Sequence, residues 1–185
     1  EVNTRVRPDV PLQRAFGRAS CAEQSTISET LSACTAENVG QMRAAVRAIL
    51  ARHGGCRGHD FASSLLMLDM DMTGMPAGRG SEGVSKGHFA GQPNCRGRQL
   101  GRVLATAYGE IVVDQLYDGK RQLTSSLGDL VEQAEATLEL DDARRRRTVL
   151  RIDGGGGSDP NIDWQLGCQQ RSYKSVEQRN KKSPK

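Results

Sequence analysis

The sequence has few aromatic side chains and no long apolar run. Phe, Trp and Tyr together make up 4% of its 185 residues, and there is a single Trp. A hydrophobic core must therefore be built from Leu, Val, Ile, Met and Ala. No stretch approaches the roughly 18 apolar residues that a membrane-spanning helix needs. This absence argues against a membrane partner, and we expect a cytoplasmic protein.

Paired cysteines are also lacking. The sequence has five cysteines, an odd number, and no C-x-x-C motif. This pattern predicts free thiols in a reducing compartment rather than a disulfide framework. His53, Cys56 and His59 recur at three-residue spacing and offer ligands for zinc, but structural zinc sites normally use four ligands in paired spacings. We therefore interpret RHGGCRGHD as a flexible, basic interdomain linker.

The charge balance is mildly basic. Lys and Arg number 26 against 22 Asp and Glu, for a net charge of +4. A polyanion partner is compatible with this balance but is not indicated by it alone. The chain begins at Glu1 and ends in the polar stretch RSYKSVEQRNKKSPK. We expect a fragment cut at both ends, with a helical segment over 1–60, a main domain over 61–170 and a disordered basic tail over 171–185.

The first predicted helix lies within residues 20–34 and contains small hydroxyl residues at its start. Ser25 is the expected N-cap. Ser25 and Thr26 occupy the position from which a helix-turn-helix contacts base edges or phosphates. An ordinary capped surface helix fits the same pattern, so the sequence leaves both interpretations open.

The second predicted helix covers residues 36–51, where apolar side chains recur at helical spacing. Thr35 is its expected N-cap, and two glycines end it. Arg43 and Arg47 lie one turn apart on its polar side. Such a pair suits either solvent or the phosphate groups of a nucleic acid.

The rest of the chain alternates strand-like and helical patterns. A glycine- and arginine-rich insertion separates the first strand from the second and third strands, which Gly109-Glu110 can join as a tight hairpin. A helix, a fourth strand and a further helix follow. This order predicts an α/β fold with a mixed sheet. The expected strands are 64–73, 102–108, 111–117 and 148–153, the expected helices are 126–140 and 160–168, and the insertion is 74–99.

Two aspartates stand at the end of the first predicted strand, in LLMLDMDMTGMPAG. Three strands, a crossover helix and a fourth strand are the opening of a ribonuclease H-like fold, here incomplete, in which the first and fourth strands are neighbours. Asp71 and Asp153 then face the same spot. Converging carboxylates repel each other unless a cation lies between them, and Mg²⁺ suits such oxygen ligands.

At these residues the sequence resembles bacterial DDE-type insertion-sequence transposases, in the segments LDMDMTGMPAGRGSEGVSKGHFAG, RGRQLGRVLATAYGEIVVDQLYDGKRQL and RRRRTVLRIDGGGG. The likeness covers residues 12–168. It implies that Asp71, in a D-x-T pattern, and Asp153, in an Arg-x-Asp pattern, are catalytic acids and metal ligands. The third family acid, a Glu, is expected beyond Lys185, since Glu177 stands in the wrong setting to replace it.

The resemblance implies a fragment of a DNA transposase. The intact enzyme would use Mg²⁺ or Mn²⁺ to cleave DNA at the element end and to transfer the strand. Its partner would be double-stranded DNA, as transposon ends and as target, at the bacterial nucleoid, and a homodimer is left open. This chain is expected to be inactive alone because it lacks the third acid.

Basic residues flank the predicted metal site, in and just after the insertion. We expect them to contact DNA phosphates, although solubility alone would account for the same charges. These predicted DNA-binding residues are Arg79, Lys86, Arg96, Arg98 and Arg102.

Asp69 and Asp71 share one face of the predicted strand, so alternation cannot decide which of them contacts the metal. The D-x-T match favours Asp71. Asp69 is then a neighbouring group, or it is the ligand if the register is shifted. Asp69 therefore stays a candidate catalytic residue.

Two other functions fit parts of the sequence. DMDMT also matches the D-x-D-x-T signature of haloacid dehalogenase-like phosphatases, with Asp69 as the nucleophile and Asp71 as the general acid and base. The hairpin that follows, where that family has helices, weighs against this match. The second alternative is a non-catalytic DNA-binding remnant that uses the helices of 20–52, the basic loop 79–102 and the arginine run 144–147.

Overall fold

The computed structural model describes residues 8–15, 17–87, 89 and 95–152. Contacts divide the chain into two units, Glu1–Arg47 and Ala48–Lys185, so the division falls inside one long helix. Three predictions lie outside the described residues, namely Asp153, the helix over 160–168 and the tail over 171–185.

The first unit is helical. It contains α2 (Val10–Ala15), α3 (Gln24–Ser32) and most of α4 (Ala36–His53). Both predicted helices are confirmed. Thr35 caps α4 as predicted, because its hydroxyl accepts from the Asn38 amide at 3.3 Å while its own amide donates to the Asn38 side chain at 3.0 Å. The predicted cap of α3 is wrong, since Glu23 holds the N-cap position and Ser25 lies inside the first turn.

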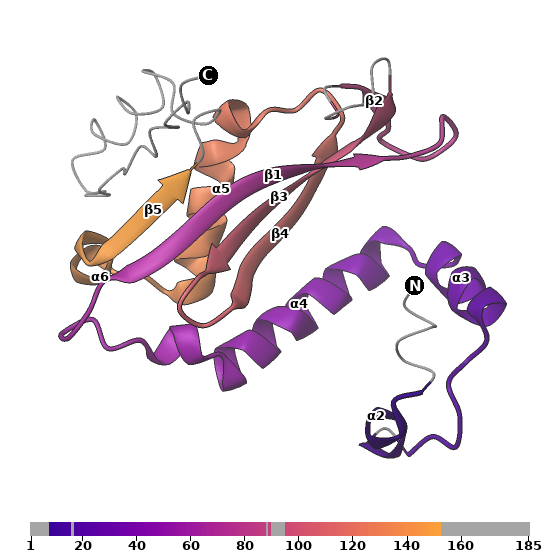
Figure 1. The fold of residues 1–185 in the computed structure, drawn as a ribbon, viewed down its shortest axis with the longest axis horizontal. Coiled ribbons are helices and arrows are strands. Elements are labelled where there is room, and N and C mark those ends of the chain that lie inside the picture. Colours follow the sequence, from indigo (N-terminus) through magenta and orange to yellow (C-terminus); the bar gives the residue numbers. More distant parts are fainter. Residues whose placement is uncertain (1–7, 16, 88, 90–94, 153–185) are drawn as a thin grey trace, which may run out of the picture. The chain divides into compact units, whose positions relative to one another are not determined.

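The second unit is mixed α/β and is built on a five-stranded sheet (Figure 1). Its strands are β1 (Leu66–Pro76), β2 (Ser85–Lys86), β3 (Arg96–Ala105), β4 (Glu110–Asp118) and β5 (Thr148–Ile152). β3 pairs antiparallel with β1 on one side and with β4 on the other. The short strand β2 pairs antiparallel with the first two residues of β3. β5 pairs in parallel with β1. The predicted meander and the return of the last predicted strand beside the first are both confirmed.

β1 and β3 extend into the predicted insertion, which leaves residues 77–95 between them. Asp71 therefore lies inside β1, and the prediction that it ends the strand is wrong. Gly74 of β1 and Gly97 of β3 lie on the side of the sheet that faces inward, next to the buried ring of Phe89. A Cβ atom at either position would lie only 2.8 Å from this ring. Because Phe89 fills this space, these parts of the strands show no apolar alternation in the sequence.

The core lies between one face of the sheet and α5 (Leu123–Leu138), which runs behind the sheet in Figure 1. Leu66, Leu68 and Met70 project from β1 into this core and are buried. Leu130 of α5 packs over Gly101 of β3, where a Cβ would approach a Leu130 methyl group to 3.0 Å. The absence of a side chain on β3 thus lets the helix come close to the sheet.

The helices between β4 and β5 begin at caps that the sequence pattern did not reveal. α5 begins at Leu123 rather than at the predicted Ser126, because Gln122 and Ser125 form its capping box. A short helix, α6 (Asp142–Arg146), then carries most of the arginine run. The Asp141 side chain caps it by accepting from the Arg144 amide at 2.8 Å.

A 3₁₀ turn, η1 (Gly55–Gly58), follows α4 and lies within the second unit. The Glu110 carboxylate at the start of β4 accepts from the amides of Gly55 and Cys56, at 2.8 and 2.9 Å. Cys56 is buried in the core. The segment RHGGCRGHD is therefore packed structure, and the prediction of a flexible linker is wrong. Residues 48–60, which include the last turns of α4, belong to the second unit, whereas they were predicted to lie in the N-terminal segment.

Candidate functional site

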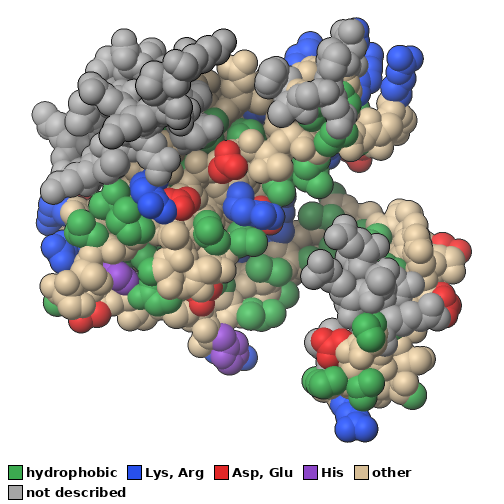
Figure 2. Space-filling model, viewed as in Figure 1, with side chains coloured by type: hydrophobic (Ala, Val, Ile, Leu, Met, Phe, Trp, Pro, Cys, Tyr) green, Lys and Arg blue, Asp and Glu red, His purple; other side chains and the backbone are tan. Residues whose placement is uncertain are grey.

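The two aspartates of β1 lie on the face of the sheet that α5 does not cover. Burial alternates along β1 from Leu66 to Met70, and Asp69 and Asp71 take the outward positions. The prediction that they share one face is therefore confirmed. Acidic and basic side chains lie next to one another across this face (Figure 2). The charged residues that matter for the site are Asp69, Asp71, Arg102, Asp114 and Arg151.

Asp69 is held by Arg151 of β5. The two residues are register partners on parallel strands, and the Arg151 Nε and Nη2 atoms donate to the two oxygens of the carboxylate. Nη2 also donates to Thr106 Oγ1 at 3.4 Å. The hydrogen bond and the charge of Asp69 raise the pKa of the Arg151 guanidinium. Asp69 thus belongs to a two-point ion pair in which each of its oxygens has a charged donor.

Asp71 has a different environment, two residues further along β1. Its side chain is exposed, and its Oδ1 accepts from the Met72 amide at 2.7 Å. Its register partner on β3 is Arg102, but that guanidinium donates to both oxygens of Asp114 on β4, at 2.9 and 3.1 Å. Within the part of the chain that the structure describes, Asp71 has no ion pair. It therefore offers a carboxylate that a cation can bind.

The pairing of β1 with β5 relates the two acidic motifs. The described ladder ends at Met70 and Ile152, the residues directly before Asp71 and Asp153. Arg151 stands two residues before Asp153, as Asp69 stands two residues before Asp71. Arg151 was not a predicted site residue, yet this equal spacing of the D-x-D and Arg-x-Asp motifs is the signal that reveals it.

The zinc candidates do not form a site in the described structure. Among the described residues, no group of three or more His, Cys, Asp or Glu could hold a metal ion. His59 shares a hydrogen bond of 2.7 Å with the Tyr108 hydroxyl, and His53 is exposed at the end of α4. Burial, and then the neighbouring Glu110 carboxylate, raise the pKa of Cys56 to about 12. The thiolate that a metal needs is therefore disfavoured.

The predicted DNA-binding residues of the first unit lie in two exposed pairs. Ser25 and Thr26 are in the first turn of α3. Arg43 and Arg47 lie one turn apart on α4. Each pair is brought together by its own helix, as the sequence predicts, and each is accessible to a ligand.

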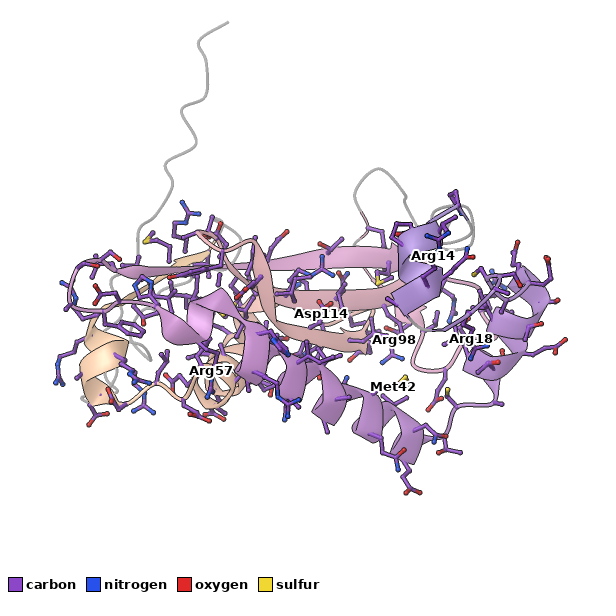
Figure 3. All side chains as sticks on the ribbon, turned by 90° about the horizontal axis from the view of Figure 1, so that it is seen from below. Arg14, Arg18, Met42, Arg57, Arg98 and Asp114 are labelled. Atoms are coloured by element: carbon purple, nitrogen blue, oxygen red, sulfur yellow. The ribbon has the colours of Figure 1, made fainter. Side chains whose placement is uncertain are left out.

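Two of the predicted DNA-binding residues of the second unit have partners within the protein. Arg98 donates to the backbone oxygens of Tyr117 and Glu82, at 3.3 and 3.4 Å, and so fixes the connection after β1 to β4. Arg102 of β3 forms an ion pair with Asp114 of β4. Figure 3 labels Arg98 of β3 and Asp114 of β4. Their charges are therefore less available to phosphate than the sequence suggests. The other predicted contacts in this unit are Arg79, Lys86 and Arg96.

The arginine run over 144–147 also has structural roles. Arg145 forms ion pairs with Glu135 of α5, at 3.3 Å, and with Asp142, at 2.9 Å. The run is therefore partly built into the packing of α5 and α6, rather than being only a free basic loop.

None of the described helices combines the length and the apolar character that a membrane span requires. No protein-family model, no curated protein and no solved structure matches the sequence. Inference about function therefore rests on the geometry and chemistry of the chain itself.

Proposed function

We propose that this chain is part of an RNase H-like DDE transposase core, in which Asp71 and Asp153 hold Mg²⁺ or Mn²⁺. The strand order supports this proposal, since the antiparallel run β4-β3-β1 is continued by a parallel β5 reached through α5 and α6. The observation that carries it is the register of β1 and β5, because the described pairing ends directly before Asp71 and Asp153.

The donor atoms on this face suit a hard divalent ion. Asp71 supplies carboxylate oxygens, the ligands that Mg²⁺ and Mn²⁺ prefer, and has no ion pair among the described residues. Asp69 is the weaker candidate because Arg151 already binds both of its oxygens. A divalent ion at this position would activate the attacking oxygen and stabilise the leaving oxygen in phosphodiester cleavage.

The other residues of the chain would position DNA. Basic groups near the strand ends would bind phosphates without reading sequence, and the helical unit would add further contacts. The resemblance also implies a third acid, a Glu on a later helix, which efficient DNA cleavage would need. The proposed DNA contacts are Ser25, Thr26, Arg43, Arg47, Arg79, Lys86 and Arg96.

Titration of the 185-residue chain with Mn²⁺, followed by electron paramagnetic resonance, tests the metal ligands. We expect Asp71→Asn and Asp153→Asn each to weaken Mn²⁺ binding by about tenfold or more. Asp118→Asn is the matched control, because Asp118 is an exposed aspartate at the end of β4 that binds the Lys120 amide at 2.9 Å. If Asp71→Asn and Asp153→Asn bind Mn²⁺ with wild-type affinity, the assignment of Asp71 and Asp153 as metal ligands is wrong.

Strand cleavage is tested in a version of the protein that carries the third acid. Nicking of supercoiled plasmid with Mg²⁺ should be abolished in Asp71→Asn and in Asp153→Asn, and kept in Asp118→Asn. If DNA binding persists while neither Mn²⁺ binding nor nicking is detected, the non-catalytic remnant is the better account.

The phosphatase alternative receives less support from the sheet. That hypothesis expects parallel neighbours on both sides of the first strand, whereas β1 has antiparallel β3 on one side. Its nucleophile would be Asp69, which is bound by Arg151. Release of phosphate from p-nitrophenyl phosphate, abolished by Asp69→Asn, would favour the phosphatase, and we expect no release.

A further inference from the structure

We infer that Arg151 is a positioning residue that confines the cation to Asp71, by holding Asp69 as a closed ion pair. This inference rests on the proposed metal site and adds a role for a residue outside it. Arg151 is on β5, two residues before Asp153, and does not itself bind a metal ion because its guanidinium has no lone pair to offer.

The contacts of Arg151 fix its direction. Nε and Nη2 each donate to one Asp69 oxygen, and Nη2 also reaches Thr106 Oγ1 at 3.4 Å. Arg151 and Asp69 are register partners, so the strands themselves set them side by side. Both side chains keep partial exposure, at 33% and 35%. The orientation of the two side chains is therefore fixed, and the pair is still exposed enough to influence an ion on the same face of the sheet.

The spacing of the two aspartates explains why such a residue is needed. Residues two apart on a strand lie about 7 Å from one another on one face. Without Arg151, Asp69 and Asp71 would both present free carboxylates, and a divalent ion could bind between or beside them. An ion drawn toward Asp69 would lie two residues along β1 from Asp71. Arg151 removes this competition by neutralising Asp69.

A second ion pair on this face, Arg102 with Asp114, does not neutralise either Asp69 or Asp71. Arg102 is the register partner of Asp71, but its guanidinium donates to both oxygens of Asp114 on β4. The two ion pairs therefore lie on either side of Asp71 and leave it as the unneutralised acid between them, within the described residues. The Asp69–Arg151 pair is the one on the β5 side, where Asp153 follows.

The test uses the full 185-residue chain and Mn²⁺ alone as the probe. Arg151→Met removes the charge and keeps much of the side-chain length, so it should free Asp69 and tighten Mn²⁺ binding about fivefold, the order of effect of one carboxylate near an exposed ion. Adding Asp69→Asn to this variant should return the affinity to the wild-type value. Arg151→Lys should stay close to wild type, because an ammonium can also neutralise Asp69.

Asp69→Asn in the otherwise unchanged chain gives an independent readout. It leaves the Arg151 charge without its partner near Asp71, so Mn²⁺ binding should weaken several-fold, and Arg151→Met in the same chain should reverse the loss. This opposite-sign pattern is not expected of a residue that only supports the fold, which thermal melts would report separately. If Arg151→Met does not fold, Asp69→Asn and Arg151→Lys still carry the test.

The results separate the inference from the proposed function. If Asp71→Asn abolishes binding while Asp69→Asn and Arg151→Met leave it unchanged, the metal site stands and the role of Arg151 is wrong. If Asp71→Asn binds Mn²⁺ like the wild type, the proposed function itself fails.

Discussion

Neighbouring charges decide what each aspartate of β1 can do. Asp69 and Asp71 are the same residue type on the same face of one strand, and the sequence pattern treats them alike. The neighbouring strands separate them, since Asp69 meets Arg151 on β5 while Arg102, opposite Asp71, is held by Asp114. The D-x-T match favoured Asp71 on likeness alone, and the ion pairs supply a physical reason for the same choice.

Glu110 carries a pH prediction at the residue scale. Hydrogen bonds from Cys56 and from the Gly55 amide lower the pKa of its carboxylate. A group whose pKa is lowered on folding stabilises the protein above its unfolded pKa, and this contribution is lost as pH falls through the folded value. We expect Glu110→Gln to lower the free energy of unfolding by about 1–3 kcal/mol near neutral pH.

Urea titrations at several pH values measure this effect. The wild type should lose more stability than Glu110→Gln as the pH falls through the carboxylate range, so the two curves should converge in acid. Glu82→Gln, at an exposed position in the connection after β1, is the control and should follow the wild type. A constant difference between wild type and Glu110→Gln at all pH values would contradict the assignment.

At the scale of elements, regular apolar spacing made α4, α5, β4 and β5 predictable to within a few residues, and their order made the pairing of β1 with β5 predictable. The start of β3 was missed because Gly97 and Gly101 face inward, where Phe89 and Leu130 supply the apolar atoms. A strand of this kind lacks the alternation of apolar and polar residues from which strands are predicted. The sequence predicted that Asp69 and Asp71 share one face of the strand, but the contact of Arg151 with Asp69 depends on the register of β1 and β5, which spacing alone had only suggested.

Replacing a glycine by alanine should change the free energy of unfolding in opposite directions at a packed position of β3 and at an open position of α4. Gly101→Ala would bring a Cβ to 3.0 Å from both Leu130 and Tyr117, so we expect the free energy of unfolding to fall by about 1–3 kcal/mol. Gly40→Ala in α4 meets no atom within 4 Å, and alanine favours a helix over glycine by about 0.5–1 kcal/mol. Denaturant titration of the two variants should therefore show opposite signs, and a neutral Gly101→Ala would show that α5 packs less tightly on β3 than these distances require.

At the scale of the whole molecule, the chain joins a helical unit to a mixed α/β unit, each with exposed basic residues. If these charges contact the phosphates of duplex DNA, as proposed, the affinity for DNA should fall as the salt concentration rises. The partners of Arg98 and Arg102 within the protein divide the predicted contacts into two groups. Only the group without such a structural role should control DNA binding.

A salt series of fluorescence anisotropy with a labelled duplex tests this division. The triple variant Arg79→Gln, Lys86→Gln and Arg96→Gln should bind more weakly and show a shallower salt dependence, by about 0.9 in the log–log slope for each phosphate group that the variant no longer neutralises. Arg102→Gln should keep the wild-type slope, since its charge is matched by Asp114. Equal slopes for the triple variant and the wild type would remove these residues from the DNA-binding surface.

Under the proposed function, Asp71, and not Asp69, binds the divalent ion together with Asp153. A crystal structure of the chain grown with Mn²⁺, with the ion located by its anomalous scattering, tests it most directly. We expect Mn²⁺ on carboxylate oxygens of Asp71 and Asp153, with Arg151 still bound to Asp69. Mn²⁺ on Asp69, with Arg151 displaced, or Asp71 and Asp153 carboxylates too far apart to share an ion, would contradict it.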